Sequence, residues 1–179
     1  MSSLDVRCLD AFPVWLKSLA EDARKLSALV EQRDLPEGLR RGSAVALNYL
    51  FKSLDLIPDG LEDLGFVDDA FVFRVAARSV SGAEAAADAA GTVARLAADA
   101  ALIEEFLGEV YPRLETYVSG LADASVRGRS VAAILTDEVK GAELVSEVRR
   151  WADGYQPPAF HRDDKNLVKL RSFLAAKLK

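Results

Sequence analysis

Carboxylates crowd one short stretch of this 179-residue sequence, SLDLIPDGLEDLGFVDDA at residues 53–70. Asp55, Asp59, Asp68 and Asp69 are its best candidates for chemistry, because clustered carboxylates supply the oxygen ligands that Mg²⁺ and Ca²⁺ prefer. These four residues are therefore candidate metal ligands. Their spacing does not match the EF-hand calcium loop, which has alternating acidic positions and a closing bidentate glutamate.

The same residues also suit a turn between two helices. Asp59 and Glu62 have the spacing of a capping box, which predicts one short helical turn inside the stretch. Asp68 or Asp69 is expected to cap the helix that follows, where the helix dipole favours negative charge. We favour this capping role, which needs no cofactor, and keep Mg²⁺ or Ca²⁺ binding as the alternative.

Asp55 fits the turn less easily than its neighbours. It lies between Leu54 and Leu56, so we expect its side chain to be partly buried. A buried carboxylate needs a partner, because desolvation disfavours its charge. The expected partners are backbone amides of the following turn, or Arg74 or Arg78 from the next helix, and such a pair would clamp the two helices together.

Residues 49–73, YLFKSLDLIPDGLEDLGFVDDAFVF, resemble the core motif of the YkvA-like family, a bacterial domain of unknown function. The family pattern is a tyrosine, then Ser-Pro-Ile-Asp-Leu-Ile-Pro-Asp, an apolar turn with glycine, and Asp-Asp opening a helix. The matching residues are Tyr49, Asp55, Leu56, Ile57, Pro58, Asp59, Gly65, Asp68 and Asp69. Ser53 and Glu62 depart from the pattern, which commonly has proline at both positions. The resemblance implies a small helical protein, in a family often labelled membrane-associated, and implies no particular activity.

Apolar residues spaced alternately three and four apart predict helices over most of the chain. Asp10 is expected to cap the first helix, with Pro13 in its first turn. The pair Asp34 and Glu37 has capping-box spacing and predicts a second helix, which should end before Pro58.

More helices are expected after the acidic stretch. One should start near Asp68, and the pair Ser81 and Glu84 predicts another helix start. A long apolar pattern follows, with a break expected at Gly108 and Pro112. Shorter helices are expected over residues 129–140 and 142–152.

No stretch shows the alternation of a β-strand. We therefore expect an all-α fold, with a single compact multi-helix domain over residues 1–179. A Pro-, Gly- and Asp-rich helix–elbow–helix should lie at its centre and contain the 49–73 motif.

Residues 163–179 are expected to form a basic amphipathic helix, capped by Asp163 or Asp164. Such a helix either packs its apolar face on the protein body, or docks on an anionic membrane surface or a protein partner. We favour packing and keep docking as the alternative. The apolar face consists of Leu167, Leu170, Phe173, Leu174 and Leu178, and the basic groups are Lys165, Lys169, Arg171, Lys177 and Lys179.

Other features narrow the function. The net charge of −5 and the pI of about 5.0 disfavour a nucleic-acid binder, which needs a basic face. The single cysteine, Cys8, excludes an internal disulfide and a cysteine zinc cage. His161, near Asp163 and Asp164, suits a surface loop better than a catalytic pair.

We therefore expect a helical module that is non-enzymatic and binds a protein partner or the cytoplasmic face of a membrane. The alternative is a divalent-cation-dependent enzyme or sensor that uses the carboxylates of residues 55–69. No signal peptide or membrane span is expected, so the predicted location is the cytoplasm, including its membrane surface.

Overall fold

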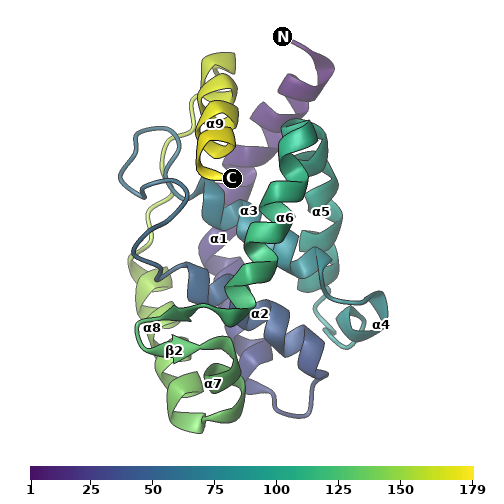
Figure 1. Ribbon diagram of the computed structural model, residues 1–179, viewed down its shortest axis with the longest axis vertical. Helices are drawn as coiled ribbons and strands as arrows, with labels where there is room; N and C mark the ends of the chain where they lie inside the picture. The colour runs from purple at the N-terminus through teal and green to yellow at the C-terminus, as the bar shows by residue number, and fades with distance from the viewer.

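Helix α3 (Val67–Arg78) lies at the centre of the molecule, and its residues from Val67 to Ala77 are all buried (Figure 1). A helix that is apolar on nearly every side must be covered on nearly every side. Helices α1 (Ser3–Glu31), α2 (Glu37–Tyr49) and α5 (Thr92–Leu107) provide most of that cover.

The computed structural model describes all residues 1–179 and confirms the all-α, single-domain expectation. The other α-helices are α4 (Gly82–Ala85), α6 (Tyr111–Gly120), α7 (Val131–Thr136), α8 (Glu138–Gly154) and α9 (Asp164–Lys177). Two 3₁₀ helices, η1 (Gly108–Val110) and η2 (Leu121–Asp123), and an antiparallel hairpin of β1 (Ser125–Val126) and β2 (Arg129–Ser130) complete the fold. No helix is both long enough and apolar enough to cross a membrane.

Aromatic rings join the central helices. Phe12 of α1 packs against Phe71 of α3 and Phe106 of α5, with ring centroids 5.1 and 5.3 Å apart. Both pairs are edge-to-face, a favoured geometry for buried aromatic rings. Trp15 is buried beside this cluster.

The expected starts of the first two helices are wrong. Helix α1 begins at Ser3 because Ser2 and Asp5 form a complete capping box, so Pro13 lies inside the helix. Helix α2 begins at Glu37 with Pro36 at its cap, and no side chain caps it.

The second helix ends well before Pro58. It stops at Tyr49, where the N–H groups of Phe51 and Lys52 turn back to the carbonyls of Asn48 and Tyr49. The chain then leaves the helix, and Leu54 projects into solvent.

Several later boundaries are confirmed. Ser81 caps α4 by accepting the N–H of Glu84. The break at Gly108 is present, with φ of 54° at that glycine, and Pro112 lies in the first turn of α6. The helix expected over 129–140 is shorter than predicted, because Arg127 and Gly128 have positive φ and turn the chain into the hairpin: α7 starts at Val131, and α8 follows from Glu138.

Helix α9 packs on the body through its apolar face. Leu167, Leu170 and Leu174 are at most 1% exposed, and α9 contacts α1. Arg171 Nε donates to the carbonyl of Phe106 over 3.0 Å. The cap is Asp163, as expected. The apolar face of α9 is therefore buried in the core, and the exposed surface of this helix is mainly polar.

Candidate functional site

The segment between α2 and α3, residues 50–66, is called the elbow below. It runs beside the chain between α8 and α9 (Figure 1), where Asp63 contacts His161. Consecutive turns shape it, with N–H groups of Leu61, Leu64 and Gly65 bonded to carbonyls three or four residues back. The single helical turn predicted from Asp59 and Glu62 is wrong, because the side chain of Asp59 accepts no backbone N–H.

Gly65 allows the elbow to fold tightly. A Cβ at this position would lie 2.1 Å from the carbonyl oxygen of Asp59, so only glycine fits without a shift of the backbone. The chain at Gly65 therefore packs directly against the backbone of Asp59.

Tyr49 and Asp68 hold the elbow to the helices on either side of it. The Tyr49 hydroxyl donates to Asp68 Oδ2 over 2.6 Å and accepts the N–H of Leu56 over 2.8 Å. The N–H of Ile57 also donates to Asp68 Oδ2, over 3.1 Å. The clamp expected at Asp55 is therefore made by Asp68.

Asp68 and Asp69 do not cap α3, contrary to the favoured interpretation. The cap position is Phe66, in the left-handed conformation with φ of 65° and without a side-chain cap bond. The two aspartates fall one and two residues inside the helix start, where the helix dipole still favours negative charge. Both side chains point into the protein and are at most 1% exposed.

Three carboxylate oxygens at this site are buried and accept no hydrogen bond: Asp55 Oδ1, Asp68 Oδ1 and Asp69 Oδ2. Such groups are rare in native proteins, because each forfeits its hydration without replacement. The expected partners Arg74 and Arg78 do not reach Asp55. They pair with Asp99 and Glu104 instead.

Burial and mutual repulsion change how these groups ionise. Burial, followed by the charges of Asp68 and Asp59, raises the pKa of Asp55 to about 7. Burial raises the pKa of Asp68 to about 6, although its bonds from Tyr49 and Ile57 act in the opposite direction. Burial and three neighbouring carboxylates hold the pKa of Asp69 well above its usual range.

Asp59 faces solvent through two adjoining hollows of about 480 Å³ each, and Asp55 lines the first of them. Both hollows are lined by Leu50, Phe51, Asp59 and Arg127. The first is completed by Lys52, Ser53, Leu54, Asp55, Pro58 and Lys177. The second is completed by Glu147, Arg150 and Trp151.

The four candidate ligands thus occupy different depths. Asp68 and Asp69 are buried, Asp55 is partly buried above them, and Asp59 is exposed at the rim. In this arrangement no three His, Cys, Asp or Glu side chains lie close enough together to hold one metal ion.

The other residues considered for chemistry have contacts or burial that fit a structural role. The His161 side chain contacts Asp63 and no serine or cysteine, while Asp163 caps α9. Ser43 is buried and donates to the carbonyl of Leu39. Burial raises the pKa of the Cys8 thiol to about 11, which keeps it protonated and unreactive at neutral pH.

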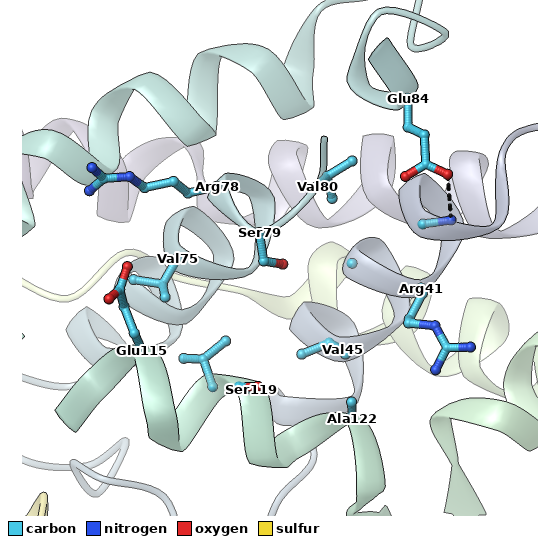
Figure 2. A pocket seen from close by; sticks show the side chains of 13 residues that line it. Arg41, Val45, Val75, Arg78, Ser79, Val80, Glu84, Glu115, Ser119 and Ala122 are labelled. Carbon is cyan, nitrogen blue, oxygen red and sulfur yellow. Dashed lines mark hydrogen bonds between the residues drawn. The ribbon is translucent and has the colours of Figure 1, made fainter. Parts of the chain in front are cut away.

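A further hollow, of about 430 Å³, lies between α2, α3 and α6 (Figure 2). Figure 2 shows Arg78 and Glu115 at one side, and Arg41 and Glu84 at the other. Three of these four charged groups already have partners, since Arg41 pairs with Glu37, Arg78 with Glu104, and Glu84 accepts the N–H of Gly38. This hollow therefore gives less reason than the elbow to expect a ligand.

Sequence reasoning missed Tyr49 as the residue that organises the elbow and Arg127 as part of its rim. Tyr49 was part of the recognised motif, but its spacing from Asp68 gave no sign of a contact across 19 residues. No family model, curated protein or solved structure matches this chain. The resemblance of residues 49–73 to the YkvA-like family therefore stays a prediction.

Proposed function

We propose that this protein is a non-enzymatic helical module whose acidic elbow responds to a divalent cation, Mg²⁺ or Ca²⁺. The observation that carries the proposal is the set of buried, unpartnered oxygens of Asp55, Asp68 and Asp69. A hard cation is the natural partner for such oxygens, because it supplies charge compensation and coordination at once.

Cation binding requires the elbow to close. Asp68 and Asp69 are fixed on α3, whereas Asp55 and Asp59 belong to a segment built from turns. The hollow beside Asp55 and Asp59 gives a cation a route from solvent. Because the present arrangement brings no three ligands together, a bound cation would draw Asp55 or Asp59 inward.

This difference between two elbow conformations is what makes the module a sensor. A ligand shifts a conformational equilibrium only by its difference in affinity for the two states. If a cation binds only the closed elbow, a higher cation concentration increases the fraction of protein with a closed elbow. The surface of the protein at the elbow then changes with cation concentration.

An enzymatic role has less support. The one histidine lies at the surface beside Asp63, away from the buried carboxylates. Docking through the apolar face of α9 also has less support, since that face is buried.

The test is a thermal shift of chelator-treated protein titrated with Ca²⁺ or Mg²⁺. A cation that binds only the folded state raises Tm with concentration. We expect a rise for the wild type, no rise for Asp55→Asn, and an unchanged rise for Glu62→Gln, which removes an exposed carboxylate of the same elbow. The proposal fails if neither cation raises Tm, or if Asp55→Asn responds as the wild type does.

A further inference from the structure

Leu54 is the most exposed large hydrophobic side chain of the protein, at 81%. It stands at the elbow beside Lys52, Arg127 and Lys177, which line the same hollow. We infer that this face of the elbow docks on an anionic membrane surface, with Leu54 entering the lipid and the three cations facing the headgroups. The inference rests on the proposed function for its control by a cation.

The three cations come from separate parts of the chain. Lys52 belongs to the elbow and donates to the carbonyl of Leu54 over 3.0 Å. Arg127 belongs to the hairpin turn and lies over the ring of Phe51, 5.0 Å from its centroid. Lys177 is at the end of α9. The fold thus gathers positive charge around one exposed leucine, on a protein whose net charge is −5.

The shape of this face favours a lipid surface over an acidic protein. A stable protein interface buries roughly 1,200–2,000 Å² around a central apolar cluster. Here a single apolar side chain projects from a turn. A bilayer accepts one projecting side chain together with nearby cations, because each basic group near an anionic surface contributes independently.

The carboxylates of the elbow oppose this docking. Asp55 and Asp59 line the same hollow and repel anionic headgroups. A divalent cation held by the elbow carboxylates would neutralise them and leave the charges of Lys52 and Lys177 uncompensated, beside Arg127, which pairs with Glu147 over 3.4 Å. Membrane docking would then depend on the cation, as the output of the proposed sensor.

This surface differs from the membrane-binding helix that the sequence suggested. The apolar side chains of α9 stay in the core, and only its terminal Lys177 takes part. Docking therefore needs no unfolding of the body.

The test is co-sedimentation of the full chain with vesicles at low salt, with and without millimolar Ca²⁺. Vesicles of phosphatidylcholine mixed with phosphatidylserine are compared with vesicles of phosphatidylcholine alone. We expect binding to the anionic vesicles only, stronger with Ca²⁺ and weaker at high salt. Leu54→Ser should weaken it about tenfold or more, because the apolar side chain that enters the lipid is lost.

Val139→Ser is the matched control, because Val139 is also a well-exposed aliphatic residue, at 65%, and does not line the hollow. It should bind as the wild type does. Absence of binding to anionic vesicles with Ca²⁺ at low salt overturns the inference, as does equal loss in Leu54→Ser and Val139→Ser.

Thermal shifts without vesicles separate this inference from the proposed function. A Ca²⁺-induced rise in Tm without vesicle binding contradicts membrane docking and supports the proposed cation site. Vesicle binding that depends on Leu54 but not on Ca²⁺, with no rise in Tm, supports the surface and overturns its control by a cation.

Discussion

Tyr49 donates its hydroxyl proton to Asp68 Oδ2 over 2.6 Å, and this bond joins the end of α2 to the start of α3 across the elbow. The same hydroxyl accepts the N–H of Leu56, so one side chain fixes both ends of the turn. Tyr49 is 1% exposed, and burial and the charge of Asp68 raise its pKa. The group is therefore a neutral donor at neutral pH.

Removing this hydroxyl should destabilise the protein. Tyr49→Phe leaves the Leu56 N–H without an acceptor and Asp68 Oδ2 with the Ile57 N–H alone, which is expected to lower the free energy of unfolding by about 1–3 kcal/mol. Urea denaturation measures the change. Tyr111→Phe is the control, because that hydroxyl accepts only from Arg78, whose side chain is 39% exposed and keeps its pair with Glu104, and it should cost less. An equal decrease in the free energy of unfolding in the two variants would show that the hydroxyl of Tyr49 stabilises the fold no more than that of Tyr111.

Neutralising Asp55 should stabilise the protein at high pH. The pKa of Asp55 is raised to about 7 in the fold, against about 3.9 for an unfolded aspartate. The folded state therefore holds more protons between these values, and its stability falls as pH rises through them. Asp55→Asn removes that penalty.

The expected gain for Asp55→Asn is about 1–2 kcal/mol at pH 8 after solvent screening, and close to zero at pH 4. Chemical denaturation at the two pH values, without divalent cations, measures it. The clamp role predicted for Asp55 from sequence requires the opposite, a loss at both pH values.

Cation affinity should rise with pH. The raised pKa values of Asp55 and Asp68, about 7 and about 6, mean that a cation must displace protons in order to bind at lower pH. We expect the dissociation constant for Ca²⁺ to fall about tenfold or more from pH 6 to pH 8, by calorimetric titration. A constant affinity over this range would place the binding carboxylates outside the buried cluster.

The sequence indicated this region but not its internal geometry. Helical periodicity predicted the core faces, and the pair Ser81 and Glu84 correctly marked a helix start, because both signals are local. The start at Asp10 was wrong because Ser2 and Asp5 form a competing cap nearer the N-terminus. Local signals compete, and packing decides between them.

The elbow was harder to predict for a physical reason. Clustered aspartates all have the same local propensity, so spacing cannot tell which one points inward. Asp68 points inward because it accepts the hydroxyl of Tyr49, and the position of Tyr49 depends on how α2 and α3 cross. The hairpin at Arg127 and Gly128 was missed because strands of two residues leave no alternation to detect.

The buried Arg74 should be far more sensitive to mutation than its neighbour Arg78. Arg74 is fully buried, bonds Asp99 and the carbonyl of Ala70, and lies 4.0 Å from the centre of the Trp15 ring. Arg78, one turn later on α3, pairs with Glu104 at the surface. Breaking a buried pair costs about 3–5 kcal/mol, whereas an exposed pair contributes at most about 1 kcal/mol.

Arg74→Ala should therefore lower the free energy of unfolding by about 3–5 kcal/mol, against less than about 1 kcal/mol for Arg78→Ala, by urea denaturation. Because Arg74→Ala also removes buried volume, Arg74→Met separates charge from packing. A methionine fills much of the same space but leaves Asp99, which is 30% exposed, to be stabilised by Arg95 and water. If Arg74→Met is as stable as the wild type, the guanidinium contributes packing alone. A loss of more than about 2 kcal/mol would assign the difference to the ion pair with Asp99 and the contact with Trp15.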